Sequence, residues 1–237
     1  MTTSPGSIFL LPSPLQENDV SSIPVIVLNA IHSLDYFIVE NARTARRYIS
    51  ATKHPRLISD LIFEEIGDGT LTAAEIERLL LPVMQGRNAG VMSEAGLPAI
   101  ADPGSLIVRA AHQKKIKVVP YPGPSSIMLA LMASGLEGQR FSFHGYLSAK
   151  RKELGLQLNE LQRRADRDAA TQIFIEAPYR NTQVMEEAEK NLSAQRLFCI
   201  AANLGSENGF IRTHTIAEWK KLTWPSIHKL PAVFLIR

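Results

Sequence analysis

Two turns rich in glycine and proline constrain this chain more than any other feature. The first spans Ser93–Gly104 and the second spans Pro120–Pro124, and each follows a short apolar run and precedes a helical pattern. Glycine lets a backbone approach a ligand closely, and proline fixes the direction of a turn. Because one strand–helix unit separates the two turns, the sequence predicts that they form the walls of one cofactor site.

Each turn leads into a helix with a well-marked start. Asp102 is placed to cap the first helix, with Pro103 in its first position, and Ser125 is placed to cap the second. The second helix is apolar over Ile127–Ala133 and is expected to stop at Gly135. The positive dipole ends of both helices then face the turns, which suits a carboxylate or a phosphate. Either turn alone is typical of an ordinary α/β connection, whereas the two together favour a site.

Strand and helix patterns alternate along the chain, which predicts an α/β fold. The crowding of prolines in Pro120–Pro124 predicts two α/β domains, residues 1–120 and 121–237. The expected strands are Ile8–Leu11, Tyr36–Val39, Gly90–Met92, Ile116–Val119, Phe141–Leu147, Gln172–Glu176, Leu197–Ala202, Ile211–Thr215 and Ala232–Ile236. Further helices are expected at Ser22–Leu34, Ala42–Ile49, from a Thr72–Glu75 capping box to about Leu81, and at Glu153–Ala165, Thr182–Asn191 and Ile216–Leu222.

The composition is that of a globular protein. Of the 237 residues, 45% are hydrophobic and 21% are charged, so the chain can bury a core. The one cysteine, Cys199, lies in an apolar run and is expected to be a buried small hydrophobe. No apolar run approaches the roughly 20 residues that span a membrane, and the N-terminal apolar run lacks a basic flank. The expectation is a soluble cytoplasmic protein without a membrane partner.

The charge is mildly positive and uneven. The net charge is +3, and residues 140–237 hold 15 Lys and Arg against 10 Asp and Glu. Basic clusters such as Arg43/Arg46/Arg47 and Lys150/Arg151/Lys152 could meet phosphates, although each cluster alone is more typical of a solvated face. The basic second half modestly favours a polyanionic substrate.

Several catalytic motifs are absent from the sequence. There is no phosphate-binding loop of the G-x-x-x-x-G-K-[ST] type, no G-x-G-x-x-G and no G-x-S-x-G. The six histidines are scattered, and none has metal-site spacing to another or to Cys199, so no metal is expected. What remains is a backbone-lined pocket, which suits a reaction in which a cofactor carries the reactive group.

Five segments of the chain match a series of sequence motifs in order. The run Ser93–Gly104 resembles S-D-A-G-x-P-x-I-S-D-P-G, and Val118–Ser125 resembles V-x-P-x-P-G-P-[SC]. Phe143–Leu147 resembles F-x-G-[FY]-L-P, with Ser148 in place of the last proline, and Phe174–Arg180 resembles F-[YF]-E-[SA]-P-[HY]-R. Leu10–Leu15 resembles a V-x-T-P-[IL] opening. Together these motifs resemble those of the tetrapyrrole (corrin/porphyrin) methylase superfamily, and within it the bacterial branch that methylates a ribose 2′-hydroxyl of small-subunit ribosomal RNA.

This resemblance implies an S-adenosylmethionine-dependent methyltransferase with the cofactor in a cleft between two α/β domains, usually as a homodimer. It also implies substrate-side roles for Arg43, Lys150, Tyr179 and Arg180, with ribosomal RNA as a possible partner. The cofactor-binding residues that it implies are Pro12, Ser93, Gly96, Leu97, Ile100, Ser125, Ser126, Ala177, Ala202 and Pro231.

The chain departs from the branch in segments on the probable substrate side. Gln16–Ser21 only partly match G-N-L-x-D-[IL]-[ST], and Ala202–Ser206 stand where the branch has R-E-L-T-K. Leu230–Pro231 replace a G-E pair, whereas Glu40 and Arg43 of A-E-D-T-R are kept. Three alternatives to an RNA acceptor follow: a small molecule such as a tetrapyrrole, a protein residue, or a degenerate binding protein without activity.

Methyl transfer to a hydroxyl needs alignment of the acceptor and gains from a base within hydrogen-bond reach. The candidate catalytic residues are Glu94, Asp102 and Glu176, with Tyr179 and His144 less favoured. Asp102 is equally well explained as a helix cap, and Arg180 as an ion-pair partner of Glu176 or Asp168. The expectation is that no single base is essential.

Overall fold

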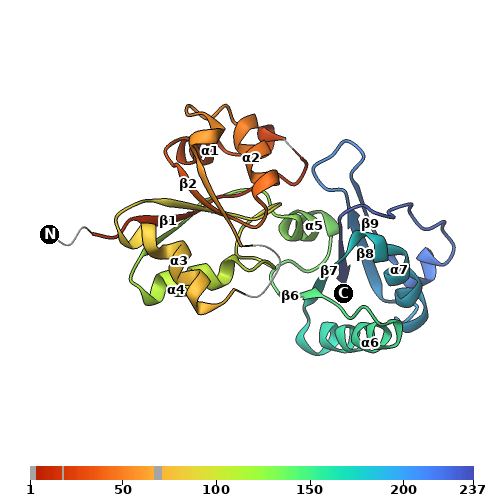
Figure 1. Ribbon diagram of the computed structural model, residues 1–237. Coiled ribbons are helices and arrows are strands. Elements are labelled where there is room, and N and C mark those ends of the chain that lie inside the picture. The colour runs from red at the N-terminus through yellow and green to blue at the C-terminus, as the bar shows by residue number, and fades with distance from the viewer. Residues whose placement is uncertain (1–3, 18, 67–70) are drawn as a thin grey trace. The chain divides into compact units, whose positions relative to one another are not determined.

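The structure is a computed structural model that describes residues 4–17, 19–66 and 71–237 (Figure 1). Asn18, within the segment compared above with the ribosomal RNA branch, lies outside the described residues. The chain forms two compact units, Met1–Ser125 and Ser126–Arg237. Each unit has its own five-stranded sheet, so the α/β prediction is confirmed.

The sheet of the first unit is entirely parallel. Its strands are β1 (Ser7–Leu10), β2 (Tyr36–Val39), β3 (Ile62–Glu65), β4 (Ala89–Met92) and β5 (Lys117–Pro120), in the order β3-β2-β4-β1-β5. All residues of β2 and β4 are buried, because helices cover both faces of the sheet. The edge strand β3 is the one strand that the sequence patterns did not predict.

Helices α1 (Val25–His32) and α2 (Ala42–Ala51) cover one face, and α3 (Ala73–Met84) and α4 (Gly104–Gln113) cover the other (Figure 1). The neighbouring strands β1 and β4 are therefore followed by helices on opposite faces. In open α/β sheets this reversal creates a crevice at the carboxyl ends of the two strands, where ligands bind. Short 3-10 turns lie at Val20–Ser22 and Ile58–Asp60.

The helices form where they are predicted, but several of their ends shift by up to three residues. The Thr72–Glu75 capping box is present, but α3 continues through Pro82 to Met84. Helix α4 begins at Gly104, so Pro103 precedes its first residue, and the carboxylate of Asp102 accepts a hydrogen bond from the Gly104 N–H at 2.7 Å.

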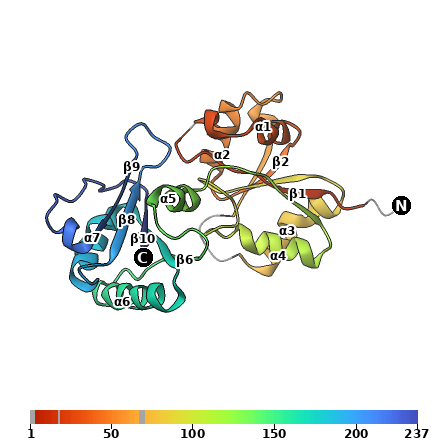
Figure 2. The same ribbon diagram turned by 180° about the vertical axis from the view of Figure 1, so that it is seen from behind.

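The second unit has a mixed sheet. Its strands are β6 (Phe141–Tyr146), β7 (Thr171–Glu176), β8 (Leu197–Ala202), β9 (Phe210–Thr215) and β10 (Ala232–Ile236), in the order β6-β7-β10-β8-β9. Strands β6 and β7 are parallel, and the other pairs are antiparallel. Helix α5 (Ser126–Ser134) covers one face, and α6 (Arg151–Asp168) and α7 (Asn181–Asn191) cover the other (Figures 1 and 2). As predicted, α5 stops before Gly135, whose φ is +70°.

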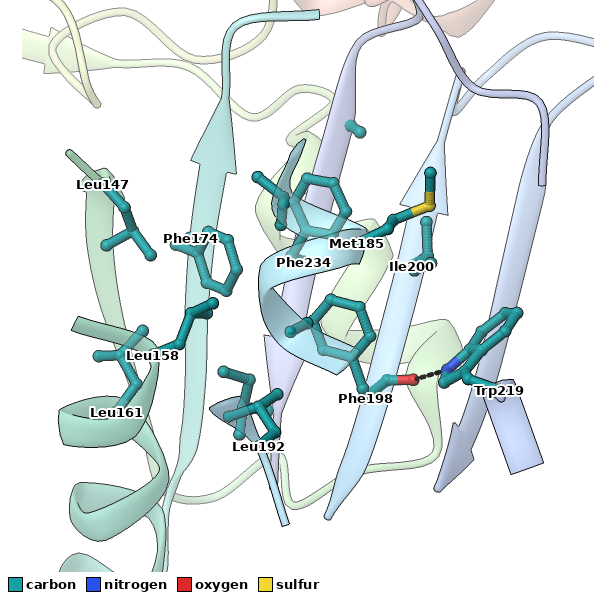
Figure 3. Close-up of a cluster of buried hydrophobic side chains, with 14 of the residues drawn as sticks. Leu147, Leu158, Leu161, Phe174, Met185, Leu192, Phe198, Ile200, Trp219 and Phe234 are labelled. Atoms are coloured by element: carbon teal, nitrogen blue, oxygen red, sulfur yellow. Dashed lines mark hydrogen bonds between the residues drawn. The ribbon is translucent and has the colours of Figure 1, made fainter. Parts of the chain in front are cut away.

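The core beneath α6 and α7 is mostly aliphatic, with a stack of aromatic side chains at its centre (Figure 3). Phe234 of the central strand stacks on Phe174 at 5.3 Å and on Phe198 at 5.9 Å between ring centroids. Trp219, in the short helix α8 (Ile216–Trp219), donates a hydrogen bond to the Phe198 carbonyl at 2.8 Å. Cys199 is buried, and burial raises its pKa to about 11, in agreement with a packing role.

Among the described residues, no helix is long and apolar enough to cross a membrane. The same part of the chain contains no group of three His, Cys, Asp or Glu side chains that could hold a metal ion.

Candidate functional site

The loops after β1 and β4 meet at the crevice of the first sheet. The Ser13 N–H donates to the Gly96 carbonyl at 2.8 Å, and the Gly96 N–H donates to the Ser13 carbonyl at 3.0 Å. The buried Ser13 hydroxyl also donates to the Ser93 carbonyl at 2.7 Å. The Tyr48 hydroxyl donates to the Pro12 carbonyl at 3.1 Å. These bonds hold the Pro12 loop and the first Gly/Pro turn as one backbone-lined wall.

The second Gly/Pro turn lies against the same wall. Gly96 has a φ of +75°, and a Cβ added there would lie 3.5 Å from the Pro124 carbonyl oxygen. A Cβ added at Gly123 would lie 2.2 Å from the Cβ of Pro12, closer than any real contact. The two turns therefore approach to van der Waals distance, and glycine at 123 is required by space. Ser125 and Ser126 follow at the start of α5.

The middle of the first turn is strained and rests on Asp102. Ala99 and Ala101 both have a left-handed backbone conformation, with φ of 66° and 63°. This conformation is unfavourable for a residue with a Cβ, and such strained residues are concentrated at the functional sites of proteins. Asp102 Oδ1 accepts hydrogen bonds from Ala99 N–H at 3.0 Å and from Gly104 N–H at 2.7 Å. Burial raises the pKa of Asp102, and these backbone bonds oppose the rise. The contacts of Asp102 are those of a loop-holding and helix-starting residue.

Glu94 lies beside a cavity of about 290 Å³ in the first unit. Its N–H donates to Glu40 Oε2 at 2.9 Å, and its Oε1 accepts from the Thr44 hydroxyl at 3.2 Å. Arg43 is exposed on α2, Ile100 is 46% exposed, and Leu97 is half-buried. The cavity is lined by Pro14, Leu15, Glu17, Thr44, Arg47, Tyr48, Glu94 and Ala95.

In the second unit, the structure brings together the three late residues that the resemblance implied. Ala232 of β10 pairs with Glu176 on one side and with Ala202 on the other. Ala177 directly follows Glu176, and the Asn203 N–H donates to the Pro231 carbonyl at 2.8 Å. Ala177, Ala202 and Pro231 thus lie at one edge of the sheet, where β7 and β8 end and β10 begins.

Glu176 and Arg180 form a buried ion pair at this edge. Their Oε2 and Nη2 atoms are 2.9 Å apart, and the side chains are 1% and 12% exposed. Burial raises the pKa of Glu176, against the Ala177 N–H and the Arg180 charge, which lower it. Arg180 Nη2 also donates to the Ser148 carbonyl at 2.6 Å. The ion-pair alternative for Arg180 is therefore the observed contact, and Arg180 connects the ends of β6 and β7.

The remaining substrate-side and catalytic candidates differ in exposure. Lys150 is exposed and forms an ion pair with Glu153 at 3.0 Å. Tyr179 is 67% exposed on the 3-10 turn Pro178–Arg180. His144 Nε2 lies 2.8 Å from Gln172 Oε1, within the sheet.

Sequence reasoning missed three residues that hold the site. Ser13 pairs with Gly96, Gly123 packs against Pro12, and Asn181 donates to the carbonyls of Ile227 and Leu230, each at 2.8 Å. Only Gly123 carried a signal, as a glycine between two prolines. The roles of Ser13 and Asn181 depend on contacts distant in sequence.

Comparisons with known proteins agree with this geometry. The model of the tetrapyrrole (corrin/porphyrin) methylases matches residues 19–220. The chain is 27% identical over 236 residues to ribosomal RNA small subunit methyltransferase I of Escherichia coli O157:H7, covering 96% of this chain and 70% of that protein. To the protein of the same name from Xylella fastidiosa it is 28% identical over 202 residues, covering 85% and 70%.

Solved structures show the same fold. The methyltransferase CobJ aligns with a TM-score of 0.67 at 17% identity, over 98% of this chain and 93% of that one. Diphthine synthase aligns with a TM-score of 0.65 at 16% identity, over 97% and 88%. The family model matches most of the length of the chain, and the two Gly/Pro turns converge in its structure. This chain therefore belongs to the tetrapyrrole (corrin/porphyrin) methylases and is an S-adenosylmethionine-dependent methyltransferase.

Proposed function

We propose that this chain methylates a ribose 2′-hydroxyl of small-subunit ribosomal RNA. The observation that carries the proposal is the contact between the two Gly/Pro turns at the crevice of the first sheet, in a chain whose relatives are named for small-subunit ribosomal RNA methylation. The retained Glu40 and Arg43 support the same branch. We further propose that the enzyme acts in the cytoplasm as a homodimer.

Two glycines of the first unit support a cofactor site at these loops. Gly96 and Gly123 keep side chains out of the space where the loops approach, so that backbone groups line it. We propose that Pro12, Ser93, Gly96, Leu97, Ile100, Ser125 and Ser126 contact the cofactor from the first loops, and that Ala177, Ala202 and Pro231 contact it from the second sheet. We propose domains of residues 1–120 and 121–237, and both of them contribute residues to this site.

The cofactor supplies an electrophilic methyl group for in-line displacement by the acceptor oxygen. The chain contributes mainly by positioning, which can supply most of the acceleration in such a reaction. Asp102 and Glu176 are held in structural contacts, whereas Glu94 is exposed beside the 290 Å³ cavity. Glu94 is therefore the better placed of the three to accept a proton, and we expect its replacement to slow turnover without abolishing it.

A methyl-transfer assay tests the proposed function. Small ribosomal subunits from cells that lack this enzyme are incubated with the purified chain and S-adenosylmethionine that carries a tritiated methyl group. The expected result is label in the ribosomal RNA, at a linkage that resists alkaline hydrolysis because the 2′-hydroxyl is blocked. Label in protein or in an added tetrapyrrole instead would replace the proposed acceptor. Absence of cofactor binding by calorimetry would identify a degenerate binding protein.

A further inference from the structure

The carboxyl ends of β6 and β7 carry two large aromatic side chains that are mostly exposed, Tyr146 and Tyr179. Tyr146 is the last residue of β6 and is 62% exposed, and Tyr179 follows β7 and is 67% exposed. The two strands are adjacent and parallel, so both tyrosines lie at the same edge of the sheet. Two aromatic side chains that are more than half exposed at one edge of a sheet favour a surface that contacts another molecule.

A β-bulge sets the direction of Tyr146. Phe143 pairs with Ile173 and Tyr146 pairs with Ile175, so β6 holds one more residue than β7 between these pairs. Gly145 occupies the bulge with a φ of +65°. Bulges of this kind re-aim side chains next to functional sites, and here the bulge places Tyr146 on the same face as Phe143.

Hydrogen bonds hold three loops at this edge as one surface. Arg180 donates to the Ser148 carbonyl at 2.6 Å, and Gln183 Nε2 donates to the Ala149 carbonyl at 3.1 Å. The Lys229 N–H donates to the Pro178 carbonyl at 3.0 Å, next to Tyr179. The loop after β6, the turn after β7 and the loop before β10 are therefore fixed to one another.

Two lysines give this edge positive charge. Lys229 is exposed and has a left-handed φ of 63°, and the buried amide of Asn181 binds the carbonyls on either side, at Ile227 and Leu230. Lys150 is exposed, and its ammonium group forms an exposed ion pair with Glu153, which is weak enough to exchange for a phosphate. Lysine beside exposed aromatic rings is the chemistry of single-stranded nucleic-acid binding.

We propose that Tyr146 and Tyr179 stack on unpaired bases of the RNA substrate while Lys150 and Lys229 bind its phosphates. This inference rests on the proposed function for the identity of the RNA. It assigns recognition of an unpaired segment to the second unit, at the edge that carries Ala177 and Pro231. Sequence-tolerant stacking of this kind selects single strands over duplexes, because paired bases do not offer their faces.

The test measures binding of a fluorescein-labelled single-stranded RNA oligonucleotide by anisotropy, with the full chain, against the same sequence as a duplex. Wild-type protein is expected to prefer the single strand. Tyr146→Ala and Tyr179→Ala are each expected to weaken binding by about 5- to 100-fold, the usual loss for a stacked base. Tyr179→Trp is expected to restore binding, since it keeps an aromatic face.

Phe141→Ala is the matched control, because Phe141 is 41% exposed at the opposite end of the same strand. It is expected to bind like the wild type. Lys229→Ala is expected to lower the dependence of log affinity on log salt by about 0.7, the value for one phosphate contact on a single strand, whereas the tyrosine variants leave the slope unchanged. Calorimetry with S-adenosylmethionine and thermal unfolding verify that each variant is folded.

The inference is overturned if both tyrosine variants bind RNA like Phe141→Ala, or if wild type binds the duplex as tightly as the single strand. Its failure differs from failure of the proposed function. If the wild type methylates small-subunit RNA and the tyrosine variants bind RNA as tightly as the wild type, only the proposed stacking surface is rejected. Tyrosine-dependent RNA binding without ribosomal RNA methylation would support the surface and reject the acceptor.

Discussion

Ser13 and Gly96 exchange two backbone hydrogen bonds, although they lie on loops that follow different strands. The pair joins the ends of β1 and β4, the adjacent strands whose following helices cover opposite faces of the sheet. Ser13 and Gly96 thus form an additional backbone pair beyond the carboxyl ends of β1 and β4, where the crevice opens. The wall of the candidate cofactor site is built by main-chain geometry, so its sensitivity to substitution should appear at glycines.

Gly96→Val should weaken cofactor binding and lower stability. Gly96 has a φ of +75°, and a left-handed conformation costs a residue with a Cβ about 1–2 kcal/mol. We expect a loss of that size in the free energy of unfolding and at least about tenfold weaker S-adenosylmethionine binding by calorimetry. Gly138→Val is the control, because a Cβ there has no atom within 4 Å. Equal cofactor affinity in the two variants would remove Gly96 from the site.

Gly123→Ala should disrupt the contact between the second turn and the Pro12 loop. The added Cβ would lie 2.2 Å from Pro12 Cβ, so one of the two loops must move. We expect a lower melting temperature and loss of cofactor binding. Introducing Pro12→Gly in the same chain removes the clashing atoms and should restore part of the lost melting temperature. No recovery in the double variant would show that Pro12 is not the obstacle.

Asp102→Asn should separate a positioning role from a catalytic one. Because burial raises the pKa of Asp102, the folded state holds its proton more tightly than the unfolded state, and stability from this group is lost as pH rises through the folded-state pKa. The Asn variant should flatten that dependence in acid, keep the loop bonds and retain turnover. Asp102→Ala should lose about 1–3 kcal/mol of stability. An inactive Asn variant with intact stability and cofactor affinity would instead identify Asp102 as an essential base.

Arg180→Ala should destabilise the second unit by about 3–5 kcal/mol at neutral pH, because it leaves the Glu176 carboxylate buried without its ion-pair partner. The deficit should shrink as pH falls through the raised pKa of Glu176, where the carboxyl becomes neutral. Chemical unfolding at several pH values measures both effects. Arg167→Ala removes an exposed ion pair with Asp168 and should change the free energy of unfolding far less than Arg180→Ala does. Similar losses in the two variants would argue against the buried pair.

Part of the fold could be predicted because several strands are continuous apolar runs. Three strands, Tyr36–Val39, Leu197–Ala202 and Ala232–Ile236, match their predicted bounds, and each is almost wholly buried. Strand β3 escaped prediction because it is an edge strand of two apolar and two acidic residues, with Ile62 40% exposed. A continuous apolar run predicts a strand only when every residue of that strand is buried. An edge strand such as β3 is partly exposed, so its sequence mixes apolar and charged residues and gives no such run.

The candidate site could be predicted in part. Glycine and proline predicted the two turns, because their backbone preferences are local. The partners of those turns could not be predicted, since Ser13 with Gly96 and Arg180 with Ser148 are brought together only by the order of strands. Arg180 was expected either on the substrate side or as an ion-pair partner of Glu176 or Asp168. The observed pair with Glu176 depends on burial that no local pattern encodes.

Strand β10 comes after the other four strands of its sheet in the chain, yet it lies between β7 and β8. During synthesis, β6–β7 and β8–β9 can each pair early, but each half keeps an unpaired, apolar edge until residues 232–236 have emerged. Such edges are templates for aggregation. The sheet of the second unit therefore cannot be completed strand by strand from its amino end. A chain released by a ribosome that stalls before residue 232 would contain two separate strand pairs with exposed apolar edges, and it would be prone to aggregate.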